Sequence, residues 1–342
     1  MDRKKTTTEE LAAKRESKMT DWNVEEAKDS IKNGGRFGAK RVMEAVYRNN
    51  IDVFRHWGYR LPGGKLVGLG DRNALLDGTK VHARAFDVND MPQCGCETRT
   101  GCINADCVDV AESLIAAGLK PAILNLASRR KPGGGYDRGM SAQEETLCRL
   151  STLSQSLYQY FDPSRKCVQD AEVPHRFNAY PLDIDFGGIY SPDVVFFRHN
   201  LRYGYAFRET PFSCGVITVA ALSFREPNAY CNEERQYMAP DGGFTPAGDA
   251  IQLNKIRTIC RLALKNGRDS IVLGAFGCGV NKLPCDAVAD QFRRVFAEPE
   301  FAGKFRALVF AILEGGGSTR RPVEESGKFA PFYATFGKWQ GV

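Results

Sequence analysis

Residues 121–153 read PAILNLASRRKPGGGYDRGMSAQEETLCRLSTL, and this is the most informative stretch of the chain. The apolar run at 122–127 has the length and composition of a buried strand. A basic turn that ends in proline leads to three glycines at 133–135, which allow a tight loop whose backbone N–H groups approach a ligand. Gln-Glu-Glu at 143–145 then opens a segment of helical composition, which we expect to run on to residue 160. The sequence thus predicts a strand that leads into a glycine loop with two carboxylates beside it.

Each part of this stretch has an ordinary explanation. A glycine triplet is commonly a flexible turn, and glutamates at the start of a helix interact favourably with the helix dipole. The combination is rarer, and it resembles the signature of poly(ADP-ribose) glycohydrolases, in particular the compact bacterial-type branch of this macrodomain family. That signature is a glycine triplet, a spacer of several residues and Gln-Glu-Glu, and here seven residues separate Gly135 from Gln143. The flanking segments LNLAS and LCRLSTL also resemble the family.

A second glycine-rich loop follows another apolar run in residues 270–281, which read SIVLGAFGCGVN. We expect a helix to start near Cys285, so that backbone N–H groups between strand and helix can hold a diphosphate. The residues of an NTPase P-loop or of a dinucleotide-binding fold are missing. Macrodomains hold ADP-ribose between two such loops, so the resemblance extends to this one. Asn281 differs from the family, which has an aromatic residue there that packs on the distal ribose.

The other segments indicate an α/β fold, because strands and helices alternate along the chain. The sequence predicts strands at 80–88, 122–127, 192–199, 212–224 and 307–313, and helices at 109–117 and 249–266. The resemblance implies a macrodomain-like three-layer α/β/α fold with a mixed central sheet, plus an N-terminal helical extension. We expect two domains, an N-terminal helical arm at residues 1–60 and a macrodomain-type catalytic domain at residues 61–342.

The two glutamates constrain the chemistry. Glycoside hydrolysis commonly uses carboxylates on opposite sides of the bond, but adjacent helical residues point only about 100° apart. One carboxyl group must therefore protonate the leaving oxygen and later deprotonate water. The resemblance implies that Glu145 is this general acid/base and that Glu144 holds the ribose hydroxyls.

The resemblance also implies a set of substrate-binding residues from both loops and from neighbouring strand ends. These residues are Asp106, Asn125, Ser128, Gly133, Gly134, Gly135, Gln143, Gly274, Ala275, Phe276, Gly277, Cys278, Gly279, Val280 and Asn281. Asp106 would contact the adenine amino group, but an Asp just before a helix is equally suited to be its N-cap.

We therefore expect a poly(ADP-ribose) glycohydrolase that hydrolyses ribose–ribose O-glycosidic bonds and releases ADP-ribose. Three alternatives remain open from the sequence. The protein could be an ADP-ribose-binding reader without turnover, which Asn281 favours, or a hydrolase of another ADP-ribosyl linkage. It could also be an unrelated α/β protein with coincidental loops.

Composition sets further expectations for the 342 residues. Subtracting 41 acidic from 47 basic residues gives +6, which suits a phosphate-bearing ligand and is too small for bulk nucleic-acid binding. The N-terminus lacks the apolar core of a signal peptide, and no apolar run is long enough to span a membrane. We expect an intracellular monomer, cytoplasmic or nuclear, that acts on poly(ADP-ribose), ADP-ribose and ADP-ribosylated proteins. We expect no membrane association, no sequence-specific nucleic-acid binding and no cofactor.

Eleven cysteines are many, and four of them cluster. Cys94, Cys96, Cys102 and Cys107 have a spacing that is not a standard zinc pattern. We expect a reduced loop insertion with no metal, although the spacing alone leaves zinc open.

Overall fold

The computed structural model describes residues 22–92, 94–95, 97–165, 173–226, 232–314 and 327–341. The chain divides into two compact units, each assembled from several segments. We call Met1–Asp77, Gly133–Phe177 and Val194–Ser213 the glutamate unit, because it contains both glutamates. Gly78–Pro132, Asn178–Asp193 and Cys214–Val342 form the sheet unit.

A seven-stranded mixed sheet has the order β3-β6-β7-β5-β8-β9-β4. Its strands are β3 (Lys80–His82), β4 (Arg99–Ile103), β5 (Pro121–Leu126), β6 (Gly188–Arg198), β7 (Phe207–Val219), β8 (Ser270–Leu273) and β9 (Ala307–Ala311). β3 pairs antiparallel with β6, whereas β5 pairs parallel with β7 and β8, and β9 pairs parallel with β8 and β4. The mixed central sheet expected from the sequence is thus confirmed.

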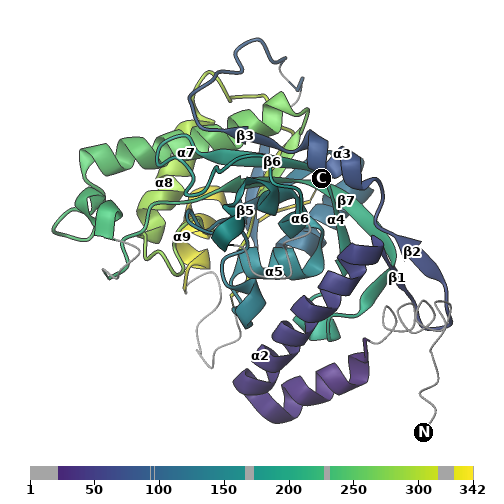
Figure 1. Ribbon diagram of the computed structural model, residues 1–342. Coiled ribbons are helices and arrows are strands. Elements are labelled where there is room, and N and C mark those ends of the chain that lie inside the picture. The colour runs from purple at the N-terminus through teal and green to yellow at the C-terminus, as the bar shows by residue number, and fades with distance from the viewer. Residues whose placement is uncertain are drawn as a thin grey trace, which may run out of the picture. The chain divides into compact units, whose positions relative to one another are not determined.

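Helices cover both faces of this sheet within the sheet unit. Alternate side chains such as Leu124, Ile271 and Phe310 share one hydrophobic core with α7 (Pro246–Lys265), α8 (Cys285–Phe296) and α9 (Phe329–Phe336). These three helices lie together in Figure 1. α4 (Cys107–Ala116) packs on β5 and β8, and its apolar residues are outside that core. Because side chains alternate between the faces of a strand, α4 covers the opposite face. The three-layer architecture is therefore confirmed.

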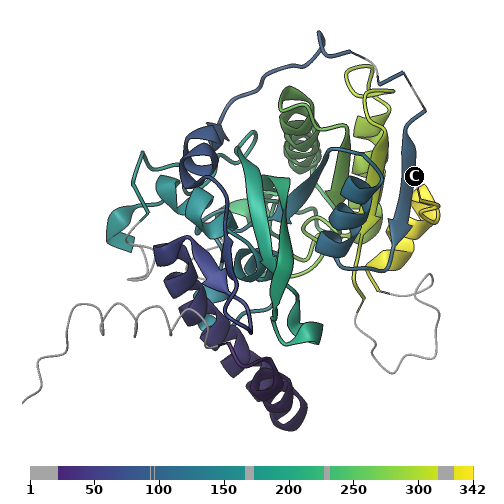
Figure 2. The same cartoon turned by 90° about the vertical axis from the view of Figure 1, so that its right-hand side faces the viewer.

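The glutamate unit contains the N-terminal helix, so the expected helical extension is confirmed. α2 (Val24–His56) is the long purple helix of Figure 2 and is kinked at Gly35, with φ 51° and ψ −134°. β1 (Gly58–Arg60) and β2 (Leu66–Gly68) form a small antiparallel sheet, and α3 (Arg72–Gly78) follows. The expected domain boundary at residue 60 stays a prediction.

The rest of the glutamate unit consists of short helices. They are η1 (Tyr136–Arg138), α5 (Gln143–Leu150), α6 (Leu153–Leu157), η2 (Tyr158–Tyr160), η3 (Pro163–Arg165) and η5 (Leu201–Tyr203). The prediction of one helix up to residue 160 was wrong, because the chain becomes extended at Ser151 and pairs there with Phe196. The Ser151 hydroxyl also accepts the N–H of Leu153 at 3.2 Å, at the start of α6.

Two strand predictions need correction in the sheet unit. The strand predicted at 80–88 ends at His82, the last residue that pairs with β6. The segment expected to be a cysteine-containing insertion includes β4, whose ladder with β9 runs from Arg99–Ala307 to Ile103–Ala311. The local sequence pattern did not predict β4, because this strand is stabilised by pairing with a strand some 200 residues away in the sequence.

Candidate active site

The triglycine loop has a backbone that other residues rarely adopt. Gly133 and Gly134 have φ of 68° and 52°, in the left-handed region. A Cβ atom on Gly134 would lie 2.4 Å from Oε1 of Glu145. Glycine is therefore required here both for conformation and for close approach to a glutamate.

The two glutamates are bonded to the loop that precedes them. The N–H of Gly133 donates to Oε1 of Glu144 at 3.1 Å, and the N–H of Gly135 donates to Oε1 of Glu145 at 3.0 Å. We expected these N–H groups to face a ligand, and in this structure they hold the carboxylates. The triplet therefore fixes the position of both acids, while its contact with substrate stays a prediction.

Both carboxylates are buried at the N-terminus of α5, where the helix dipole favours negative charge. Glu144 is 3% exposed and Glu145 is 9% exposed. Oε2 of Glu145 is buried and has no hydrogen-bond partner among the described residues. One oxygen of Glu145 is thus anchored, and the other has no partner in the part of the chain that the structure describes, while the role of Glu145 in proton transfer stays a prediction.

Arg149 contacts the segment that follows the triplet, whereas the sequence left open whether it neutralises the two glutamates or is exposed. Its guanidinium is fully buried one helical turn after Glu145, and Nη2 donates to the carbonyl oxygens of Tyr136, at 3.1 Å, and of Met140. Burial lowers the pKa of Arg149, and the charge of Glu145 is among the effects that oppose this. Arg149 therefore ties α5 to the segment that follows the glycine triplet. No local pattern distinguishes it from an exposed helical arginine.

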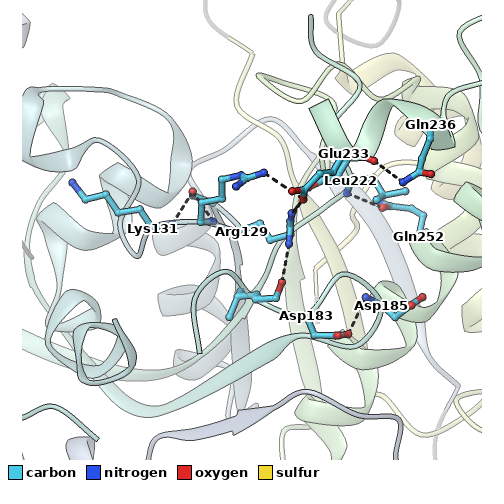
Figure 3. A network of polar contacts seen from close by, with 12 residues as sticks. Arg129, Lys131, Asp183, Asp185, Leu222, Glu233, Gln236 and Gln252 are labelled. Atoms are coloured by element: carbon cyan, nitrogen blue, oxygen red, sulfur yellow. Dashed lines mark hydrogen bonds and ion pairs between the residues drawn. The ribbon is translucent and has the colours of Figure 1, made fainter. Parts of the chain in front are cut away.

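At the end of β5, the predicted polar residues are held by neighbouring elements of the sheet unit. Asn125 is buried, and its Nδ2 donates to Oγ1 of Thr218 at 3.2 Å. The Ser128 hydroxyl accepts the N–H of Lys131 at 3.3 Å (Figure 3). These contacts shape the turn before Gly133, and a role of either side chain in ribose binding stays a prediction.

Arg129 anchors the same turn, and sequence reasoning missed it as well. Its guanidinium contacts Glu234 at 2.7 Å and Glu233 at 3.0 Å. Its carbonyl oxygen accepts the N–H of Leu182 at 2.8 Å, and its Nη1 donates to the Leu182 carbonyl oxygen at 3.4 Å. Figure 3 shows this network converging on Arg129. The turn before the glycine loop is therefore fixed by partners that lie 53 to 105 residues further along the chain.

Lys255 adds a buried cation to this network. It is 1% exposed, and its Nζ has no hydrogen-bond partner in the described parts of the chain. Burial lowers the pKa of Lys255 from 10.5 to about 8, while the charge of Glu234 opposes that change. Arg129, Glu234 and Lys255 thus form a group of interacting charged side chains next to the turn that precedes Gly133.

The second glycine loop runs from Gly274 to the start of α8 at Cys285, as the sequence predicted. Gly277 has φ 78°, and a Cβ atom there would lie 2.4 Å from Cδ1 of Leu283. Phe276 and Cys278 are buried in the hydrophobic core. Their side chains therefore serve packing, while binding of a diphosphate by the loop backbone stays a prediction.

The far end of this loop is more exposed. The side chain of Val280 is exposed, and the carbonyl oxygen of Asn281 accepts the N–H of Phe224 at 2.8 Å. Asp106 is the N-cap of α4, because its Oδ1 accepts the N–H of Val108 at 2.8 Å. The N-cap alternative for Asp106 is confirmed, and its adenine contact stays a prediction.

The predicted site residues divide between the two units. The glutamate unit brings together the triplet, Gln143, Glu144 and Glu145. The sheet unit contains Asp106, Asn125, Ser128 and residues 274–281. Among the described residues no group of three or more His, Cys, Asp or Glu side chains could hold a metal ion, and Cys96 lies outside them. In the same residues, no helix is long and apolar enough to cross a membrane.

Comparisons with known proteins agree with the family resemblance. Residues 48–199 match the family model of the microbial-type PARG catalytic domain. A search of curated proteins found no match. The structure of poly(ADP-ribose) glycohydrolase (PARG) from Thermomonospora curvata is 25% identical with a TM-score of 0.63, over 86% of this chain and 99% of that chain. PARG from Deinococcus radiodurans in complex with ADP-ribose is 25% identical with a TM-score of 0.56, over 79% of this chain and 98% of that chain. The resemblance to bacterial poly(ADP-ribose) glycohydrolases is thereby confirmed, by the family model over residues 48–199 and by the solved structures over most of the chain.

Proposed function

We propose that this protein is a glycosidase that hydrolyses the ribose–ribose O-glycosidic bonds of poly(ADP-ribose), with Glu145 as general acid/base. The geometry of Glu145 is the observation that carries this proposal. Its carboxylate is buried, fixed by the N–H of Gly135, and leaves Oε2 without a partner among the described residues. A fixed carboxyl group with one oxygen that makes no protein hydrogen bond among the described residues is suited to transfer a proton at a single point.

The reaction needs only one such group. Glu144 and Glu145 are bonded to N–H groups two residues apart, so both lie on one side of any substrate that enters the loop. Glu145 would donate its proton to the leaving ribose oxygen as the glycosidic C–O bond breaks. Water would then attack the oxocarbenium-like ribose and return a proton to Glu145. Glu144 would hold the ribose hydroxyls.

The second loop would supply the binding of the substrate diphosphate. Its glycines precede α8, and backbone N–H groups in such a loop attract phosphate oxygens. Asp106 would contact the adenine, and Asn125 and Ser128 would line the ribose pocket. The ligands named for the relatives, ADP-ribose and the inhibitor ADP-HPD, support a nucleoside diphosphate ligand for this chain.

A polymer digest tests the proposal. Auto-modified poly(ADP-ribose) is incubated with wild type or with Glu145→Gln, and the products are resolved by size. Glutamine keeps an oxygen for the Gly135 N–H but cannot donate a carboxyl proton. Wild type should release free ADP-ribose, and the variant should release it more slowly by at least about 100-fold. Binding of ADP-ribose to both proteins is the control for folding.

One residue favours a second candidate. Asn281 replaces the aromatic residue of the family, so the chain could be a reader that binds ADP-ribose without turnover. Unchanged polymer with retained ADP-ribose binding would support the reader and exclude the hydrolase. Release of ADP-ribose from singly modified protein, but not from polymer, would instead show another linkage as substrate.

The proposal also covers the location, oligomeric state and substrates of the protein. We propose that the protein acts as an intracellular monomer on poly(ADP-ribose) and on ADP-ribosylated proteins, without sequence-specific nucleic-acid binding. The mild net charge of +6 supports this choice over a nucleic-acid-binding protein.

A further inference from the structure

α2 lies against the segment that follows the glycine triplet. The ring of Tyr47 on α2 meets the ring of Tyr136 on η1 edge-on, with centroids 4.8 Å apart. A Cβ atom on Gly139, which has φ 67°, would lie 2.8 Å from Cγ of Lys40. The N-terminal helix is therefore packed closely beside the loop that positions Glu145, within one unit of the structure.

Large apolar and basic side chains are exposed at this junction. We call Arg36, Phe37, Lys40, Arg138 and Met140 the α2–η1 patch. Phe37 is 78% exposed and Met140 is 54% exposed, whereas most buried apolar residues of α2 lie in its later turns. Phe37 and Lys40 are three residues apart, so they are neighbours on the helix surface. The patch thus combines an open aromatic ring with three cations.

The patch is continuous with the catalytic glutamate. Cγ of Met140 and Nη2 of Arg138 lie 2.7 and 3.4 Å from the position that a Cβ atom would take on Gly135. Gly135 donates the hydrogen bond that fixes Glu145. The nearest carboxylates pair only weakly with these cations, since Glu44 is 3.9 Å from Lys40 and Asp137 is 3.9 Å from Arg138. The cations therefore remain available for an anionic ligand.

We propose that the α2–η1 patch binds the leaving chain of the polymer, as a subsite for the nucleoside diphosphate next to the bond that is cleaved. This inference rests on the proposed function. When Glu145 protonates the leaving oxygen, that oxygen remains on the ribose of the adjoining ADP-ribose unit, so this unit must lie beside Glu145. Aromatic rings stack on bases and cations attract phosphates, and the patch offers both.

Two substrates separate this subsite from the chemistry. One is poly(ADP-ribose), and the other is ADP-ribose joined at the same ribose carbon to 4-nitrophenol, whose leaving group has neither base nor phosphate. Phe37→Ala tests stacking, and Lys40→Gln tests charge. Lys65→Gln is the matched control, because Lys65 is an exposed lysine of the same unit in the β1–β2 turn.

Phe37→Ala and Lys40→Gln should lower kcat/KM for the polymer by about tenfold. They should leave turnover of the nitrophenyl substrate within about twofold of wild type, and Lys65→Gln should change neither. Equal losses on both substrates would mean that the variants disturb Glu145, and no loss on the polymer would mean that the patch does not bind it. Either result overturns the subsite.

A binding measurement keeps the subsite testable if the proposed function fails. Glu145→Gln and its double variant with Phe37→Ala are titrated with ADP-ribose and with short polymer. A subsite predicts weaker binding of polymer alone in the double variant. Equal affinities of both proteins for polymer would refute the subsite, whether or not the wild type is a hydrolase.

Discussion

Lys255 is the buried charge whose removal gives the sharpest prediction about stability. It lies on α7 at 1% exposure, and burial is the largest effect that lowers its pKa from 10.5 to about 8. This difference corresponds to a free energy of roughly 3 kcal/mol. Lys255→Met keeps the length of the side chain and removes the charge. We expect the variant to be more stable than wild type at pH 7 by up to about 3 kcal/mol.

The pH dependence follows from the direction of the change. The folded pKa lies below the unfolded one, so below about pH 8 the lysine is charged in both states and the folded protein bears the full penalty. Between about pH 8 and pH 10.5 the unfolded chain binds a proton that the folded protein does not, and the wild type gains stability as the pH rises. Above pH 10.5 the penalty is absent.

Urea unfolding of wild type and Lys255→Met from pH 7 to pH 10 measures this effect. The stability difference between the two proteins should shrink as the pH rises. Lys120→Met is the control, because Lys120 is exposed before β5 and its removal should leave the pH slope unchanged. A constant difference across the range, or a variant less stable than wild type at pH 7, would refute the reasoning.

Two further predictions concern the glycine loop and its base. Gly134→Ala should lower polymer turnover by at least about 100-fold while the protein stays folded by circular dichroism, because the methyl group would displace Glu145. Activity near the wild-type value would show that the loop tolerates the shift. Arg129→Ala should destabilise the protein by about 3 kcal/mol in urea unfolding, because Glu234 is buried and loses its closest cation. Glu233→Ala removes the exposed partner of Arg129 and should cost less than about 1 kcal/mol, so equal effects of the two variants would contradict the assignment of Glu234 as the dominant partner.

The sequence was sufficient where the structure depends on neighbours in the chain. The strand at β5, the triplet at Gly133 and the helix that starts at Gln143 all lie within about 25 residues. Glycine conformation, apolar runs and the helix start are local properties, so they are visible in one stretch of sequence. The helix at Cys285 after the second glycine loop was predicted for the same reason.

The sequence could not assign the groups that support this stretch. The sequence left open whether Arg149 is exposed or neutralises the glutamates, and Arg129 looked like an ordinary basic residue. In the structure Arg149 is fully buried, and Arg129 is held by Glu234, 105 residues away. Phe276 and Cys278 looked like ligand contacts, and the structure buries both in the core. Burial and ion pairing depend on which distant segments pack together, and no local pattern reports that.

The α/β class, the two glycine loops, the glutamate pair and the resemblance to microbial-type poly(ADP-ribose) glycohydrolases could all be predicted from the sequence. Only the tertiary structure decided that the N–H groups of Gly133 and Gly135 hold the two carboxylates, that β4 pairs with β9, and that α2 lies beside η1. The first set follows from backbone conformation and residue order over short distances. The second set follows from contacts between segments far apart in the chain, whose positions are fixed only when the whole core is packed.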